Sequence, residues 1–400
     1  MLTGLALAVA AAAAGCGGNA PVAGDDVDGG PTRDAFVDPS APLFDDSVLH
    51  EVRLTIDPSD LETLRGDIGS NTWYPATFEW KDQHLDQIGV RSRGLGSRNP
   101  TKPGFQVKFD RFVAGQKLLG LKTLVLDNAS QDGSLMKERL VLAVFRSRGL
   151  PAPRIVHARL TINGVYSGVY TIVEAVTKPF LRRTLGDDDG NLYDYDWVDN
   201  FYFEPRPSYV PVPFQPKTNE LNHDASGLAA LIAEINDAPD ADLVERLRTR
   251  IDLEALTTYL AIEAVVSERD GLAGDWGVNN FYLYQRADTQ RFVVIPWDKD
   301  YTFMGAGQSI WAGMEANVLL RRLYIAPGPL RESFKIEAEA IVTSFVNARD
   351  LIPRIDAIHA QIADAVPADP LVDAESFALA VASLREFAFA REASVLEQVR

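Results

Sequence analysis

The sequence has too few cysteines, histidines and basic residues for several common classes of protein. Its 400 residues include one cysteine, Cys16, and five histidines scattered at positions 50, 84, 157, 223 and 359. These counts exclude a disulfide scaffold and leave no thiolate and imidazole set with the spacing of a zinc site. The 39 Lys and Arg residues are outnumbered by 56 Asp and Glu, for a formal net charge of −17. Binding to phosphate backbones needs a basic surface, so we expect no nucleic-acid partner.

An uncharged apolar run occupies the start of the chain. Residues 2–14, LTGLALAVAAAAA, are too few to span a bilayer as a helix but have the length of a secretory h-region. Cys16 closes the string AAGC directly after this run, which resembles the lipobox of bacterial lipoproteins. No Lys or Arg precedes Arg33, so the usual positive n-region is missing, and a leaderless start with a chance cysteine is the alternative. We expect residues 1–15 to be a lipoprotein signal peptide, and a lipid on Cys16 to anchor the protein in the bacterial cell envelope, on the extracytoplasmic side.

The remaining sequence divides by composition into three parts. Residues 16–46 are rich in Gly, Pro and Asp and poor in large apolar side chains, which predicts an acidic, flexible tether. Residues 47–176 are rich in strand patterns and contain one helical pattern, whereas residues 177–400 are rich in helical patterns and contain one hairpin. We therefore expect an α+β fold with a β-rich N-lobe and a helix-rich C-lobe, and a ligand site between them.

Hydrophobic periodicity predicts the individual elements. Ser134–Arg148 has apolar residues at helical spacing, and Asn163-Gly164 is a strong signal for a type I′ hairpin turn. The predicted strands are Val48–Ile56, Trp73–Trp80, Leu85–Arg93, Phe105–Asp110, Leu121–Leu126, Ile155–Ile162, Val165–Val173, Asn280–Gln285 and Arg291–Pro296. The other predicted helices are Ala225–Asn236, Ala241–Arg248, Leu253–Ser267, Leu330–Asn347, Ile352–Ala365 and Ala374–Val399.

The segment 269–302 has the strongest chemical pattern. Asp275 is followed five positions later by Asn280, which opens a predicted hairpin, and the second strand ends at a loop with Asp298 and Asp300. A protein kinase catalytic segment has the same order: a loop Asp that accepts the substrate proton, an Asn that holds magnesium, and a second metal-binding Asp after a hairpin. The alternative is that these residues only form turns, where Asp and Asn are common. Two carboxylates on one face, Asp298 and Asp300, would also suit a glycoside hydrolase, which we rank third.

A kinase-like cleft also needs a glycine turn and a lysine on the next strand. Residues 93–97, RGLGS, supply the turn, and Lys108 lies on the strand that follows, on the face opposite its apolar neighbours. Lys102, in the loop before that strand, is the rival candidate. Glu138 on the predicted helix could pair with such a lysine, and Glu174 ends the strand where a hinge between lobes would run. Each of these two glutamates could equally be an ordinary surface or strand-end residue.

Taken together and in order, these motifs resemble the CotH family, the spore-coat-type atypical protein kinases. The similar segments span about residues 91 to 302 and are VRSRG at 90–94, KPGFQVKF at 102–109, NGVYSGVY at 163–170, NNFYLY at 279–284 and PWDKD at 296–300. The resemblance implies a bilobal, atypical protein-kinase-like fold that uses ATP and Mg²⁺ or Mn²⁺ to phosphorylate Ser or Thr on protein substrates.

The resemblance also implies roles for single residues. Asp275 would be the catalytic residue, and Asp298 would bind the metal with help from Asn280 and Asp300. The residues expected to contact ATP or support that contact are Lys108, Lys102, Arg93, Arg91, Glu138 and Glu174. A different class of function stays open, because some relatives are surface binding proteins and a kept fold need not mean kept catalysis.

Overall fold

The computed structural model describes residues 37–197 and 201–400, and residues 38–400 form one compact unit. The predicted signal peptide, Cys16 and most of the predicted tether lie outside the described residues. Residues 38–46, which the composition assigns to the tether, contain the short helix η1 (Ala41–Phe44) with Leu43 fully buried. Ordered structure therefore begins before the predicted start at Ser47. In the ranges described, no helix has both the length and the apolar character needed to cross a bilayer.

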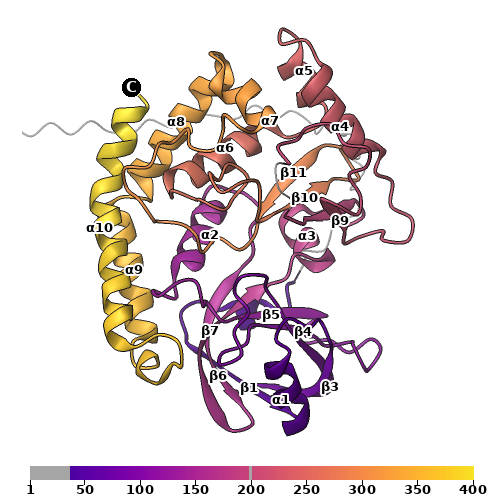
Figure 1. The fold of residues 1–400 in the computed structure, drawn as a ribbon, viewed down its shortest axis with the longest axis vertical. Helices are drawn as coiled ribbons and strands as arrows, with labels where there is room; N and C mark the ends of the chain where they lie inside the picture. The colour runs from indigo at the N-terminus through magenta and orange to yellow at the C-terminus, as the bar shows by residue number, and fades with distance from the viewer. Residues whose placement is uncertain (1–36, 198–200) are drawn as a thin grey trace, which may run out of the picture. The chain divides into compact units, whose positions relative to one another are not determined.

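Seven strands close into a barrel in the first half of the chain (Figure 1). The strand order is β1-β2-β3-β4-β5-β7-β6, and closure comes from a parallel pairing of β1 with β6, whereas the other pairs are antiparallel. Phe78, Phe105 and Phe109 are fully buried in the core that the barrel encloses. The strands are β1 (His50–Ile56), β2 (Tyr74–Trp80), β3 (Gln83–Ser92), β4 (Phe105–Lys108), β5 (Thr123–Asp127), β6 (Ile155–Ile162) and β7 (Val165–Glu174).

The predicted strands of the barrel are confirmed to within two residues at each end. The β6–β7 turn is confirmed too, since Asn163 and Gly164 have φ angles of 50° and 79°, as a type I′ turn requires. Asn163 also joins the turn to β1, because its amide exchanges hydrogen bonds of 2.8 and 2.9 Å with the backbone of Ile56. Two helices lie in the barrel's connections, α1 (Pro58–Gly66) after β1 and α2 (Lys137–Ser147) after β5.

A second sheet of four strands, in the order β11-β10-β8-β9, lies in the other half. The predicted hairpin is confirmed as β10 (Phe281–Gln285) and β11 (Phe292–Pro296), and both strands are buried along their whole length. Strands β8 (Asn191–Tyr195) and β9 (Phe214–Pro216) were not predicted, because each is short and lies in an acidic or proline-rich stretch without clear alternation.

Helices make up most of the second half. The buried helix α6 packs against α8, and α10 packs against α9 along one side of the unit (Figure 1). Asn347, predicted as the end of one helix, is instead the N-cap of the next, where its side chain accepts a 3.0 Å hydrogen bond from the Asp350 backbone. The helices are α3 (Lys178–Leu185), α4 (Ser226–Asp237), α5 (Leu243–Arg248), α6 (Leu253–Val265), α7 (Val318–Leu320), η2 (Arg321–Ile325), α8 (Pro329–Ser344), α9 (Ala348–Ile362), η3 (Val366–Ala368) and α10 (Ala374–Gln398).

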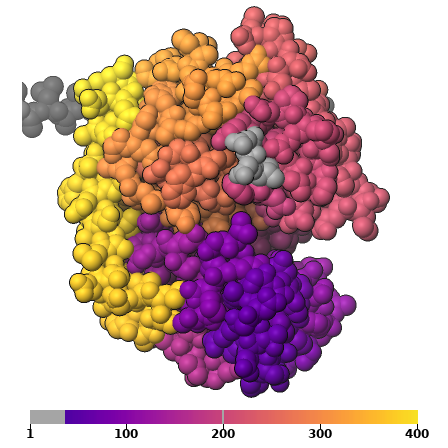
Figure 2. Space-filling view, viewed as in Figure 1, coloured from indigo at the N-terminus to yellow at the C-terminus, as the bar shows by residue number. Residues whose placement is uncertain are grey.

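The α+β class is confirmed, and the expected β-rich half takes the form of a closed barrel. The bilobal, kinase-like arrangement and the domain boundary between residues 176 and 177 stay predictions. The C-terminal segment lies against the barrel (Figure 2), where Lys102 and Asp369 form a buried ion pair of 2.7 Å. The barrel is therefore tied both to the chain that follows it and to residues near the C-terminus.

Candidate active site

A recess rich in carboxylates lies where the barrel, α2 and the loop after β11 meet. About 290 Å³ of space there, part of it open solvent, is not filled by protein atoms. Five of its lining residues are acidic, and they come from two segments far apart in the sequence, 127–138 and 298–300. The lining residues are Asp127, Ala129, Asp132, Leu135, Glu138, Arg139, Thr171, Asp298 and Asp300. We therefore take this recess as the candidate active site.

Asp298 enters the recess at the end of the predicted hairpin. Its backbone has a φ of 51°, a left-handed conformation that is uncommon for a non-glycine residue and is often found at functional sites. Its carboxylate lies 3.9 Å from the guanidinium of Arg93, which also donates a hydrogen bond to Asp127 at the end of β5. Arg93 thus connects the barrel to the loop that carries Asp298.

The electrostatics of the recess are unfavourable to the ionised form of its carboxylates. Burial raises the pKa of Asp298 to about 6; Arg93 opposes the shift, and the carboxylates of Asp127 and Asp270 add to it. Negative charge is thus concentrated beside a single arginine of the barrel.

Two neighbours of Asp298 behave in the same way. Burial, followed by the charge of Asp298, raises the pKa of Glu138 and of Asp300 well above the usual range. Both shifts come first from burial and then from repulsion between neighbouring carboxylates. A bound cation would relieve the repulsion.

The loop before the hairpin brings Asp270 close to Asp298. The side-chain amides of Asn279 and Asn280 donate hydrogen bonds of 2.9 to 3.1 Å to the Asp270 carboxylate. The Asn280 backbone also has a positive φ, at 55°, which turns the chain between this loop and β10. Asp270 is therefore held in a fixed orientation by two amides.

Asp275, the predicted catalytic residue, has a different environment. Both of its carboxylate oxygens accept hydrogen bonds from Arg269, at 2.7 and 2.8 Å, and its side chain is about one-third exposed. The described lining of the recess includes neither Asp275 nor Asp270, but the charge of Asp270 is one of those that raise the pKa of Asp298. Asn280 is thus brought to Asp270 and not to the Asp that lies five positions before it.

The two candidate lysines also lie away from the recess lining. Lys102 is fully buried in its ion pair with Asp369. Lys108 is half-buried on β4, where it alternates with the buried Val107, and within the described residues its amine has no hydrogen bond or ion pair. Arg91 donates a 2.8 Å hydrogen bond to Gln106 and lies 5.1 Å from the Trp73 ring centre. Of the basic candidates, the structure brings Arg93 alone to the described acidic residues of the recess.

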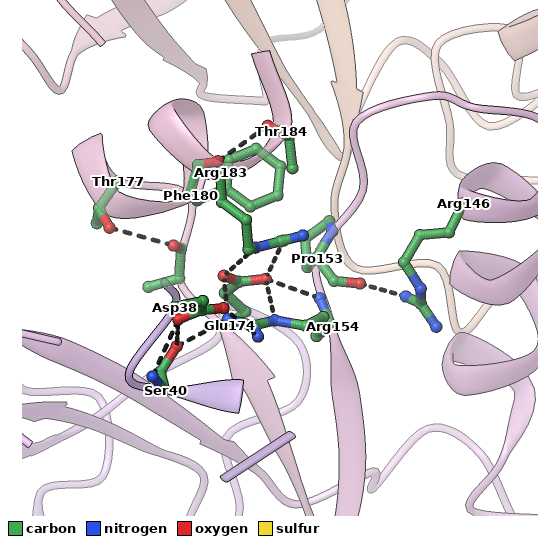
Figure 3. A network of polar contacts seen from close by, with 11 residues as sticks. Asp38, Ser40, Arg146, Pro153, Arg154, Glu174, Thr177, Phe180, Arg183 and Thr184 are labelled. Atoms are coloured by element: carbon green, nitrogen blue, oxygen red, sulfur yellow. Dashed lines mark hydrogen bonds and ion pairs between the residues drawn. The ribbon is translucent and has the colours of Figure 1, made fainter. Parts of the chain in front are cut away.

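Glu174, the predicted hinge residue, is the centre of an ion-pair network (Figure 3). Its carboxylate is buried and accepts hydrogen bonds from the guanidinium groups of Arg154 and Arg183. Arg154 extends the network to Asp38 and Ser40. Glu174 therefore joins the end of β7 to α3 and to the start of the compact unit.

Sequence reasoning missed three acidic residues of the site. Asp127 and Asp132 follow the predicted strand Leu121–Leu126, in the string DNASQD. The pairing of β5 with β4 and β7 brings them to the recess. Asp270 lies in the same loop as Asp275, ten positions before Asn280. The five-residue spacing drew attention to Asp275, whereas the structure shows the Asn280 amide hydrogen-bonded to Asp270.

The donors of the recess are suited to a hard cation such as Mg²⁺, although no cation site is complete. In residues 37–197 and 201–400, no group of three or more His, Cys, Asp or Glu side chains has the arrangement of a metal site. The carboxylates of Asp298 and Asp300 nevertheless provide oxygen ligands in the lining, and the amide of Asn280, which is hydrogen-bonded to Asp270, would add another. Magnesium usually takes only one or two protein carboxylates together with substrate phosphates, so this small set fits a metal that arrives with a nucleotide.

Comparison with known proteins identifies the chain's relatives. A model of the family described as CotH kinase protein matches residues 90–395, which include the barrel strands from β4 onward and the whole recess. The inner spore coat protein H of Bacillus subtilis is 27% identical over 333 residues, which cover 80% of this chain and 88% of that protein. The inner spore coat protein H-like protein of the same organism is 23% identical over 279 residues, or 69% and 78% of the two chains. The chain therefore belongs to the CotH kinase family.

Proposed function

We propose that this protein is an extracytoplasmic kinase that transfers the γ-phosphoryl group of ATP to Ser or Thr side chains of protein substrates. The observation that carries the proposal is the carboxylate-rich recess, in which Asp298 lies beside Arg93 and is influenced by the charge of Asp270, whose carboxylate is hydrogen-bonded to Asn280. The spore-coat names of the relatives and the predicted leader support a surface location. Acyl attachment at Cys16 remains part of the proposal.

Each residue has a distinct part in the proposed reaction. Asp270, oriented by Asn279 and Asn280, would accept the proton of the substrate hydroxyl. The hydroxyl oxygen would bond to the γ-phosphorus as the bond from that phosphorus to the bridging β-phosphate oxygen breaks, and ADP would leave. Asp298 and Asp300, with the amide oxygen of Asn280, would hold Mg²⁺. When bound with ATP, this ion would neutralise charge on the phosphates.

The cation Arg93 supports both the architecture and the chemistry of the proposed site. It pairs with Asp127 and lies 3.9 Å from Asp298, so it holds the barrel side of the recess against the hairpin side. Its guanidinium is also positioned to offset charge on a bound phosphate, which arginine does through paired N–H donors. The family resemblance implied this role for Lys108 and Lys102. Among the described residues, neither ammonium forms an ion pair with an acidic residue of the recess lining.

The proposed roles of Asp270 and Asp275 can be separated by matched substitutions. We expect Asp270→Asn to lower the rate of phosphoryl transfer about 10²- to 10⁴-fold, because the amide cannot accept the proton. Asp275→Asn should leave the rate within about threefold, because Asp275 pairs with Arg269 outside the recess lining. The measurement is transfer of label from γ-labelled ATP to the protein or to a generic Ser/Thr substrate, with Mg²⁺ or Mn²⁺.

Other outcomes of this assay have clear meanings. If Asp275→Asn abolishes transfer and Asp270→Asn does not, the sequence-based assignment is right and ours is wrong. If the native protein binds Mg-ATP but transfers no label, the non-catalytic alternative, a surface binding or adhesion protein, gains support.

Binding of Mg-ATP should weaken at acidic pH. Burial and the nearby carboxylates raise the pKa of Asp298 to about 6, so below that pH a proton competes with the cation for this ligand. We expect the affinity for Mg-ATP to fall by up to about tenfold per pH unit below 6, and to be nearly constant between pH 7 and 8. Titration calorimetry at pH 5, 6, 7 and 8 measures this dependence. An affinity that is constant down to pH 5 contradicts a role for Asp298 as a ligand.

A further inference from the structure

A buried lysine lies between the two acidic residues of the loop after β11. Lys299 has no exposed surface, and its ammonium donates a 2.8 Å hydrogen bond to Glu263 near the end of α6. The carboxylate of Glu268 lies 4.0 Å from the same ammonium. Lys299 thus points into the protein, and its partners belong to the helix and loop that precede Asp270.

The carboxylate of Glu263 also holds the loop that carries Asp270. It accepts backbone hydrogen bonds from Leu272, at 3.1 Å, and from Ala273, at 2.9 Å, in addition to the bond from Lys299. Gly271 leaves room for this contact, since a β-carbon at that position would lie only 2.4 Å from a Glu263 oxygen. One carboxylate therefore makes contact with both sides of the candidate active site.

Glu268 adds a third attachment at the same place. One of its oxygens accepts a 2.8 Å hydrogen bond from the backbone N–H of Asp270 itself. Burying charged groups is costly, and an apolar cluster of similar volume often supports a fold equally well. Stability alone therefore does not explain the buried charges of Glu263, Glu268 and Lys299. The two glutamates contact the loop of Asp270, and Lys299 is the residue next to Asp298, so the cluster connects the two loops.

We propose that Glu263 and Lys299 act as positioning residues, which fix the loop of Asp270 relative to the loop of Asp298. The expected effect of these two residues on catalysis rests on the proposed function. Their expected effect on the order of the loops rests on the hydrogen bonds alone. Without Lys299 the Asp298 loop loses its ion pair with Glu263 of α6 and keeps the backbone hydrogen bond from Phe303 to Val266. Without the Glu263 carboxylate the Asp270 loop loses two backbone contacts as well.

The test uses the full chain with Glu263→Gln, Lys299→Met and the double variant. Phosphoryl transfer is measured per folded protein, and we expect kcat to fall about 10- to 100-fold while KM for ATP stays within about threefold, because misplacement of reacting groups affects turnover more than binding. The double variant should be no slower than the slower single variant, because the two residues act as one unit. Hydrogen exchange of the backbone amides in 270–275 should be faster in all three variants.

A matched control separates positioning from loss of stability. Tyr324→Phe removes a buried 2.9 Å hydrogen bond to Thr257, which lies on the same helix α6 and whose hydroxyl bonds to Tyr324 and to the Leu253 backbone. It should lower the melting temperature without changing kcat or the exchange of 270–275. Unchanged loop exchange in Glu263→Gln and Lys299→Met overturns the inference, even if the native protein proves to have no kinase activity. Faster exchange with kcat unchanged in an active enzyme overturns its catalytic part and leaves the proposed function intact.

Discussion

Asp298→Asn should reduce phosphoryl transfer by at least about 10³-fold, the largest effect on activity that we expect from a single substitution. The Asp298 carboxylate lies 3.9 Å from Arg93 in the recess, and the charge of Asp270 acts on it. An amide in its place would be a much poorer ligand for a hard cation. Label transfer from γ-labelled ATP at pH 7.5 measures the loss. Calorimetric titration with Mg-ATP should show weakened binding in the same variant.

The substitution should not unfold the protein. Because its pKa is raised, the ionised Asp298 opposes folding near neutral pH when no cation is bound, so a neutral amide should keep or increase the melting temperature. Asp288→Asn is the matched control. Asp288 lies in the turn of the same hairpin, at the end of the strands opposite Asp298, and it pairs with Arg286 in that turn. Full transfer activity in Asp298→Asn would rule out our assignment of the metal site.

Lys102→Met should give the largest loss of stability, about 3–5 kcal/mol in the free energy of unfolding. The ammonium of Lys102 and the carboxylate of Asp369 are fully buried and 2.7 Å apart, so removing the lysine leaves a buried charge without its partner. The Asp369 carboxylate also accepts backbone hydrogen bonds from Val169 and Leu371, which fixes it in place. Urea unfolding followed by circular dichroism measures the change.

Two further variants test the physical reason for this loss. Lys122→Met removes an ion pair with Asp110 in which the lysine is 58% exposed, so it should cost less than about 1 kcal/mol. The double variant with Lys102→Met and Asp369→Asn should recover part of the stability, because no buried charge is left unpaired. If Lys102→Met is as mild as Lys122→Met, the buried pair does not hold the C-terminal segment to the barrel.

The secondary structure could be predicted well where a segment is long and regularly patterned. The barrel strands and the helices α4, α6 and α10 follow from alternation or helical spacing within a few neighbouring residues. Helix α1 was missed although Asp57 caps it and Pro58 begins it, because only Leu61 and Leu64 mark its buried side. Strand β8 pairs with the edge of β10, and β9 pairs with β8, and no local pattern in the sequence records either pairing.

The candidate site could be predicted only in part. Asp298 and Asp300 follow a clear strand at the end of a hairpin, so their place in a loop was readable from the sequence. The sequence gives no reason to prefer Asp270 over Asp275 as the hydrogen-bond partner of Asn280. That pairing depends on how the loop folds back onto Asn279 and Asn280.

Local patterning was sufficient to establish the α+β class, the hairpin and the order of the acidic motifs, because these depend on residues within a few positions of one another. Closure of the barrel, the partners of Lys102 and Lys299, and the meeting of Asp127 with Asp298 depend on contacts between distant segments. Such contacts reflect packing and the pairing of buried charges, whose energies act only once the chain has brought those segments together.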